Sequence, residues 1–329
     1  MNYTARAMPE SQWEGEAPAE PLSRCVYLLR GSAEASPSRG KSSRLAKKPN
    51  VCTTKSLFGA VILFTFVAGC NPVSVKPDSP SKTSELQPTS KPTQTTISVA
   101  AASDLKFAFD EVVSEFNKLH PEIQVETTFG SSGNFFAQLS NKAPFDTFFS
   151  ADIGYPEKLI AQGDGVKETL FSYATGHIGI WVANDSPLNP EWDGIAVLRD
   201  PAVKKIAIAN PRFAPYGRAA EAALKHFEIY ESIQHRLVLG DNIAQTAQFV
   251  ESGAADAGII AASLATASNL QKKGRFWLLP TDSYPTLVQG GVILAWAKDR
   301  KACDQLRSFV TSEAGQAILQ RHGFAQPDH

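Results

Sequence analysis

Histidine and cysteine are scarce in this chain of 329 residues, and neither has the spacing of a metal centre. There are six histidines and four cysteines. No two histidines have a ligand spacing such as His-x-x-x-His, so we expect no metal held by protein ligands. The nucleophile motif Gly-x-Ser-x-Gly is also missing, although Gly130-Ser-Ser-Gly133 comes near it. An enzyme is therefore not expected, and no cofactor is predicted.

Positive charge is not in excess either. Nine basic and five acidic residues lie in 1–69, so residues 70–329 hold 23 basic and 28 acidic side chains, a net charge of −5. A protein of that charge is a poor partner for nucleic acid or for an anionic membrane surface. Any anion that it binds is expected to be small and held by local groups.

No apolar run is long enough to span a bilayer, which takes about 20 residues. The longest run, residues 57–68, follows Lys47, Lys48 and Lys55 and precedes Gly69-Cys70. This order predicts an export signal within an N-terminal extension, residues 1–69. Val67-Ala-Gly-Cys70 resembles the bacterial lipobox, which implies lipidation of Cys70 and a place in the periplasm or cell envelope. A short uncleaved membrane anchor is the alternative.

Residues 70–96 predict a flexible tether, because Pro, Ser, Thr and Lys dominate there and few large apolar side chains are available for burial. Cleavage before Cys70 would leave only Cys70 and Cys303, so no intrachain disulfide is expected. Cys303 falls in a helical pattern and is expected to pack as a small hydrophobic residue.

From Ile97 onward, short apolar runs alternate with amphipathic helical patterns. This alternation predicts an α/β fold with mostly parallel sheets covered by helices on both faces. An apolar return segment near residues 290–297 lies close to the end of the chain. We expect two lobes, with residues 97–178 and 287–329 in the first and residues 179–286 in the second.

Small hydroxyl, amide or glycine residues occupy four junctions between a strand-like run and a helix-like run. A helix start exposes unpaired N–H groups and the positive end of a dipole, so each junction is a potential anion site. In sheets of this kind, the loops at the carboxyl ends of the strands line the ligand crevice. The junctions are Ala102-Ser-Asp104, Gly130-Ser-Ser-Gly-Asn134, Ala214-Pro-Tyr-Gly217 and Gly240-Asp-Asn-Ile243.

Six segments between residues 97 and 326 resemble, in the same order, the periplasmic molybdate-binding proteins of ABC importers. No one of them is specific, and the resemblance rests on their common order over about 230 residues. They are Ala100-Ala-Ala-Ser103, Phe129-Gly-Ser-Ser132-Gly, Ala143-Pro-Phe-Asp146 with Ser150-Ala-Asp152, Ala209-Asn-Pro-x-x-Ala-Pro215-Tyr216-Gly217, Gly253-Ala-Ala-Asp256-Ala-Gly and Arg321-His-Gly-Phe324.

The resemblance implies a type II periplasmic binding protein that closes on molybdate or tungstate between two lobes. It implies an oxyanion held through five residues, with no protein atom ligating the metal itself: Ser103, Asp104, Ser132, Tyr216 and Ile243. It further implies a membrane permease and a cytoplasmic ATPase as partners, and we expect a monomer.

Asp104 departs from the pattern of the resembling proteins, many of which carry Asn at this position. A carboxylate beside a dianion is unfavourable unless it turns away, for example to cap a helix. A binding protein of the same fold for sulfate or phosphate remains an alternative function. A ferric-complex binder is a weaker alternative, because the chain has no Tyr-Tyr pair, and an envelope-tethered sensor or adhesin is another.

Overall fold

The computed structural model describes residues 94–327, which belong to one compact unit. The predicted extension and signal at 1–69, the predicted lipidation site Cys70 and nearly all of the predicted tether at 70–96 lie outside the described residues. Within residues 94–327, no helix has both the length and the hydrophobicity needed to cross a bilayer. Two five-stranded sheets organise this part of the chain.

The first sheet has the strand order β2-β1-β3-β10-β4. β1 pairs in parallel with β2 and β3, whereas β10 runs antiparallel to β3 and β4. Its strands are β1 (Thr95–Ala102), β2 (Ile123–Gly130), β3 (Thr147–Ser150), β4 (Phe171–Gly176) and β10 (Leu287–Ile293). Its helices are α1 (Lys106–Leu119), α2 (Ser132–Ser140), α3 (Gly154–Ala161), α10 (Arg300–Thr311) and α11 (Glu313–Arg321).

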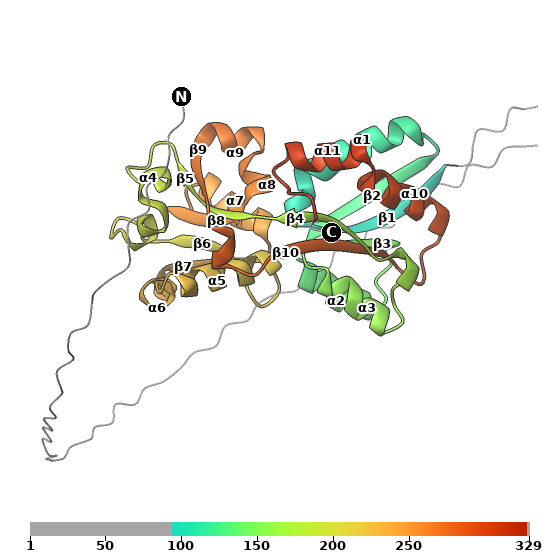
Figure 1. Ribbon diagram of the computed structural model, residues 1–329, viewed down its shortest axis with the longest axis horizontal. Helices are drawn as coiled ribbons and strands as arrows, with labels where there is room; N and C mark the ends of the chain where they lie inside the picture. The colour runs from blue at the N-terminus through green and yellow to red at the C-terminus, as the bar shows by residue number, and fades with distance from the viewer. Residues whose placement is uncertain (1–93, 328–329) are drawn as a thin grey trace, which may run out of the picture. The chain divides into compact units, whose positions relative to one another are not determined.

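Helices cover both faces of this sheet, with α1, α10 and α11 on one face and α2 and α3 on the other (Figure 1). The sequence explains the first face well. Ala108, Phe109, Val112 and Phe116 recur along α1 at steps of one, three and four residues, and all four are buried. They join a core that also includes Cys303 of α10, which is fully buried as predicted. We call this sheet and its helices the first lobe.

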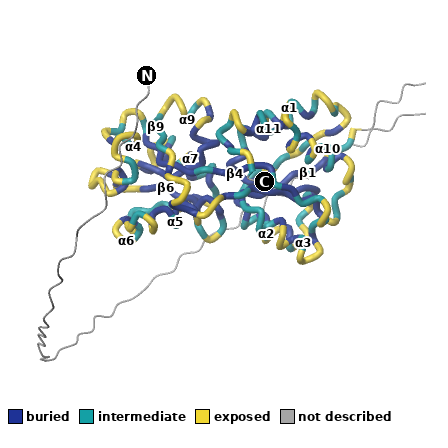
Figure 2. The backbone as a smooth tube through the Cα atoms, in the orientation of Figure 1, coloured by how far each residue is buried: buried dark blue, intermediate teal, exposed yellow. Residues whose placement is uncertain are grey.

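The second sheet has the order β7-β6-β8-β5-β9, again with two parallel and two antiparallel pairings. Its strands are β5 (Ile178–Ala183), β6 (Ile206–Ala209), β7 (Leu237–Gly240), β8 (Ala257–Ala261) and β9 (Gly274–Leu278). The helices of this second lobe are α4 (Pro190–Asp193), α5 (Pro215–His226), α6 (Tyr230–Ile233), α7 (Ile243–Glu251), α8 (Ala262–Ala265) and α9 (Ser268–Lys273). Its central strands are buried along most of their length (Figure 2).

The two-lobed α/β fold is the predicted one, but both sheets are mixed rather than mostly parallel. The difference arises where the chain crosses between the lobes. β4 passes through His177 alone into β5, and residues 279–286 carry the chain back from β9 to β10. Because β10 returns between β3 and β4, it runs against both. The parallel strands β1, β2, β6 and β7 are the ones that lead into the four predicted anion loops.

Candidate functional site

Three parallel strands of the first lobe end at one edge of the sheet. β1 ends at Ala102, directly opposite Gly130 at the end of β2, and β3 ends at Ser150. In the second lobe, β6, β7 and β8 end in the same way at Ala209, Gly240 and Ala261. Loops that follow parallel strands gather at the carboxyl edge, and here they carry all five predicted residues.

Ser103 and Asp104 follow β1 in a short 3-10 helix, Ser103–Leu105, and both are almost fully buried. The second lobe contacts each of them. The Ser103 hydroxyl accepts a hydrogen bond at 3.4 Å from the backbone N–H of Ala244, in the first turn of α7. The backbone carbonyl of Asp104 accepts one at 3.0 Å from the Ser263 hydroxyl on α8. The first predicted loop therefore lies against the second lobe.

Ser132 is the first residue of α2, whose N-cap is Ser131. The side chain of Ser132 is 1% exposed, and its hydroxyl accepts a hydrogen bond at 3.0 Å from the backbone N–H of Ala151, just after β3. The next residue, Gly133, donates its N–H at 2.9 Å to the carbonyl of Phe213 in the second lobe. The second predicted loop thus also reaches across to the other lobe.

Tyr216 lies in the first turn of α5, directly after Pro215, which favours a helix start because it has no N–H to satisfy. Its hydroxyl donates to Oδ2 of Asp104 at 2.9 Å. The amide Nε2 of Gln289 donates to the same oxygen at 2.7 Å and to the Tyr216 hydroxyl at 2.8 Å. All three residues are buried, and we call them the interlobe cluster. Asp104 therefore turns toward Tyr216 rather than capping a helix.

Ile243 begins α7, and its side chain packs in the core. Asn242 caps this helix by accepting the N–H of Gln245 at 3.0 Å. As the first helical residue, Ile243 has an N–H without an acceptor inside the helix. Its side chain can therefore pack in the core while its backbone N–H binds an acceptor outside the helix.

The structure brings the predicted residues together. Direct contacts link Ser103 to the residue after Ile243, and Asp104 to Tyr216. Ser132 joins them indirectly through Ala151, whose N–H it accepts. Ala151 belongs to the same buried cluster as Tyr216 and Ile243. The site combines helix starts, hydroxyls and one carboxyl group. Such an arrangement can enclose a small oxyanion.

Burial controls the protonation of the groups in this region. It raises the pKa of the Asp104 carboxyl to about 6, and the hydrogen bonds from Gln289 and Tyr216 lower it only in part. Burial also raises the pKa of the Tyr216 hydroxyl well above its ordinary value, with the charge of Asp104 adding to the effect. Tyr216 is therefore a neutral hydrogen-bond donor at every physiological pH.

Gln289 and Ser263 were not among the predicted site residues. Gln289 had a signal in the sequence, since it is a lone amide in the apolar segment Leu287–Leu294. A buried polar group needs partners, but the sequence does not reveal that these partners lie 185 and 73 residues away. Among the described residues, no group of His, Cys, Asp and Glu has an arrangement that would hold a metal ion.

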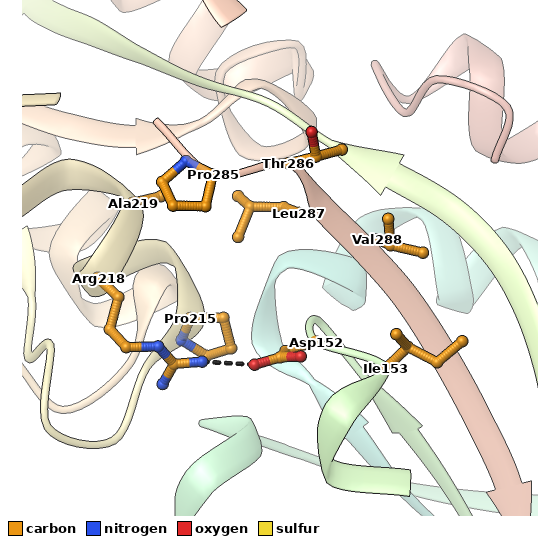
Figure 3. A pocket seen from close by; sticks show the side chains of 9 residues that line it. All are labelled: Asp152, Ile153, Pro215, Arg218, Ala219, Pro285, Thr286, Leu287 and Val288. Atoms are coloured by element: carbon orange, nitrogen blue, oxygen red, sulfur yellow. Dashed lines mark hydrogen bonds and ion pairs between the residues drawn. The ribbon is translucent and has the colours of Figure 1, made fainter. Parts of the chain in front are cut away.

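A separate cavity of about 390 Å³ lies beside α5 and the crossing segment that leads into β10 (Figure 3). None of the five predicted residues lines it. Arg218 of α5 crosses it to bind Asp152 of the first lobe at 2.5 Å, and it also donates to the Tyr155 hydroxyl at 3.1 Å. We call this contact the rim pair. Both of its charged side chains are more than a third exposed to solvent.

Comparisons with known proteins agree with this geometry. Residues 97–325 match the family described as bacterial extracellular solute-binding protein. A molybdate-binding protein of Azotobacter vinelandii is 34% identical over 228 residues, which cover 69% of this chain and 89% of that protein. One from Rhodobacter capsulatus is 31% identical over 219 residues, covering 66% and 84%.

Solved structures give the same result. The periplasmic molybdate-binding protein of Azotobacter vinelandii has a TM-score of 0.67 and 30% identity, covering 70% of this chain and 100% of that one. A sulfate-binding protein of Mycobacterium tuberculosis has a TM-score of 0.59 but 15% identity, covering 71% and 88%. The second likeness shows the fold alone.

Proposed function

The chain belongs to the bacterial extracellular solute-binding proteins, and from this we propose that it captures molybdate or tungstate for an ABC importer. The observation that carries the proposal is the meeting of both lobes at the predicted loops. The hydroxyl of Ser103 and the first turn of α7 are in contact there, and Asp104 meets Tyr216. The likeness to two molybdate-binding relatives supports the choice of ligand.

We propose that the ion is held by neutral donors. Ser103, Ser132 and Tyr216 would contribute hydroxyls, and Asp104 and Ile243 would contribute backbone N–H groups. Hydrogen bonds to a charged group are each worth about 1.5–3 kcal/mol, so several of them can hold a dianion without a lysine or arginine. Molybdate and tungstate carry no proton at neutral pH and act as acceptors only, which matches a pocket rich in donors.

Capture would proceed by closure of the lobes about the crossing segments at His177 and residues 279–286. The closed protein, acting as a monomer, would then deliver the ion to a membrane permease driven by a cytoplasmic ATPase. Lipidation of Cys70 would hold it in the periplasm or cell envelope, with residues 70–96 as the tether. The proposed activity is binding, and no step requires a cofactor or a catalytic residue.

A melting-temperature screen tests the ligand. Molybdate, tungstate, sulfate and phosphate are each added to the purified protein over a range of concentrations. A ligand at 1,000-fold excess over its dissociation constant adds about 4 kcal/mol of stability, so molybdate and tungstate should give a large shift. The paired variant Ser103→Ala/Ser132→Ala should lose that shift. Equal stabilisation by sulfate or phosphate would contradict the assignment of molybdate.

A further inference from the structure

The carboxyl group of Asp104 is an unusual component for an anion pocket. Its Oδ2 accepts two hydrogen bonds, from Tyr216 and Gln289. Its Oδ1 is buried and has no hydrogen-bond partner among the described residues, and the same holds for Oε1 of Gln289. Buried acceptors without donors are costly. Two of them, on residues joined by a hydrogen bond, indicate that a donor is missing from this region.

The position of Asp104 makes its charge important. It follows Ser103 directly, its side chain is 1% exposed, and the second lobe closes over its backbone through Ser263. An ionised carboxylate so close to a bound dianion would repel it, and little water is present to screen the repulsion. A dianion and an ionised Asp104 are therefore poorly compatible in the closed pocket.

The surrounding elements offer no counter-charge that is free to offset this repulsion. Tyr216 and Tyr173 are neutral groups whose hydroxyl pKa values are raised by burial and by the charge of Asp104. On α5, Arg218 is engaged with Asp152, and on α7, Glu251 is engaged with Lys273. On α1, Lys106 stands over the ring of Phe107, at 5.8 Å from its centroid.

The remaining neighbours are also neutral or disfavour charge. Burial lowers the pKa of His177, at the crossing between the lobes, so its neutral form is favoured. The strand β10 and the helix α8 contribute the uncharged Gln289 and Ser263. Protonation of the carboxyl itself is thus the direct way to remove the charge.

We propose that the pocket takes up its oxyanion together with one proton from solvent, and that Asp104 holds this proton in the closed complex. The inference rests on the proposed oxyanion-binding function. Asp104 is then the residue that selects the ligand by its proton content. An unprotonated dianion needs the neutral acid, whereas an anion that brings its own hydroxyl can donate to the ionised carboxylate.

The hydrogen bonds show what the proton would do. While Asp104 is ionised, the single proton of the Tyr216 hydroxyl is directed at Oδ2. Once Oδ2 carries a proton, that proton can be donated to the Tyr216 oxygen, which frees the Tyr216 proton for the anion. A proton on Oδ1 would instead turn this unpartnered acceptor into an O–H donor. Either placement converts an acceptor into a donor and removes one negative charge.

The pH dependence follows from this linkage. In the structure without an anion, burial raises the pKa of Asp104 to about 6, and a neighbouring dianion would raise it further. Above pH 6 the free protein must gain a proton on binding. The affinity for molybdate should then fall about tenfold for each pH unit, as it does for any process coupled to one proton.

Calorimetry tests the proposal on the intact protein. Molybdate is titrated at pH 8 in two buffers of different ionisation enthalpy, and the difference in binding enthalpy gives the number of protons taken up. We expect close to one proton per molybdate for the wild type and for the control Asp110→Asn, which alters an exposed carboxylate on α1. We expect none for Asp104→Asn, whose amide is neutral at every pH and can donate.

The affinities at pH 7, 8 and 9 provide the second readout. The wild type should lose about tenfold per unit, and Asp104→Asn should stay constant and bind more tightly at pH 9. Tight binding by the wild type without proton uptake, or uptake that persists in Asp104→Asn, would overturn the inference and leave the proposed function intact. Failure of molybdate and tungstate to bind at any of these pH values would instead overturn the proposed function.

Discussion

Two of the polar contacts between the lobes have opposite character. The interlobe cluster, formed by Asp104, Tyr216 and Gln289, is buried and contains a carboxyl group without a cation. The rim pair, Arg218 with Asp152, is an ion pair in contact with solvent (Figure 3). Both contacts link α5 to the first lobe. Only the buried contact lies among the residues that we propose to bind the anion.

The difference shows where a charge matters in this protein. At the rim, water screens the ion pair, and such exposed pairs contribute about 0–1 kcal/mol. In the interlobe cluster, desolvation has moved the pKa of Asp104 from 3.8 to about 6. One pKa unit corresponds to about 1.4 kcal/mol. The buried carboxyl group of Asp104 is therefore expected to influence stability and binding more than the solvent-exposed rim pair does.

Asp104→Asn should give the largest effect on stability. The folded-state pKa of Asp104 lies above its unfolded value, so the folded protein binds the proton more tightly. The free energy of unfolding of the wild type should therefore fall from about pH 4 to about pH 6 and then level off. Asp104→Asn should not lose stability over this pH range. At pH 8 its free energy of unfolding, measured by urea denaturation, should exceed that of the wild type by as much as about 3 kcal/mol.

The control for this prediction comes from the rim. Asp152→Asn removes a carboxylate that is about a third exposed, and it should change the free energy of unfolding at pH 8 by less than about 1 kcal/mol. At pH 4, where Asp104 is protonated, Asp104→Asn and the wild type should have nearly equal stability. If Asp104→Asn were less stable than the wild type at pH 8, the folded protein would accommodate the ionised carboxylate of Asp104 well.

Tyr216→Phe should weaken binding of the anion without unfolding the protein. The substitution removes a buried hydroxyl that donates to Asp104 and, in our proposal, to the anion. A hydrogen bond to a charged group is worth about 1.5–3 kcal/mol, so calorimetry should show a loss of about ten- to a hundredfold in affinity. Ser132→Ala should act similarly, and unchanged affinity in both variants would remove the proposed site.

Gly133→Ala should separate closure from folding. A Cβ at this position would lie 2.5 Å from the carbonyl oxygen of Phe213 in the other lobe and 2.9 Å from the Tyr155 hydroxyl. The backbone oxygen cannot move aside easily, and overpacking of this kind costs about 1–3 kcal/mol. Affinity measured by calorimetry should fall by more than the melting temperature without ligand, because Ala favours a helix more than Gly does and offsets part of the strain.

Gly253→Ala provides the opposite pattern as a matched control. A Cβ there meets nothing within 4 Å, but the backbone has φ +74°, which L-residues adopt with strain. This variant should lose stability and keep its affinity. If Gly133→Ala behaved in the same way, the contact between Gly133 and Phe213 would not be part of ligand-linked closure.

The sequence predicts the loops of the site better than it predicts their partners. Ser103, Ser132 and Ile243 each stand where an apolar strand meets a helix, and such junctions are marked by neighbouring residues. Gln289 becomes part of the cluster only because β10 returns between β3 and β4, far along the chain. The mixed sheets were missed for the same reason, since the direction of a pairing is not encoded locally.

Two strands have only weak signals in the sequence, for physical reasons. Ser, Thr and Gly interrupt the apolar residues of β4, Phe171–Gly176, and its burial depends on β10 at its side. β9, Gly274–Leu278, is an edge strand that remains partly exposed and pairs only with β5 among the described strands. The protonation of Asp104 was likewise beyond the sequence, because desolvation depends on the closed packing of both lobes.

Arg218→Met should give the smallest effect and so completes the comparison. The substitution keeps much of the apolar stem that lines the cavity beside α5 and removes the charge that binds Asp152. Because the pair is solvent-exposed, we expect the free energy of unfolding to change by less than about 1 kcal/mol, and by less still in 1 M salt. Urea denaturation at both salt concentrations measures this. A loss comparable to that of Tyr216→Phe in molybdate affinity would instead place Arg218 among the groups that attract the anion, and the pocket would then not rely on neutral donors alone.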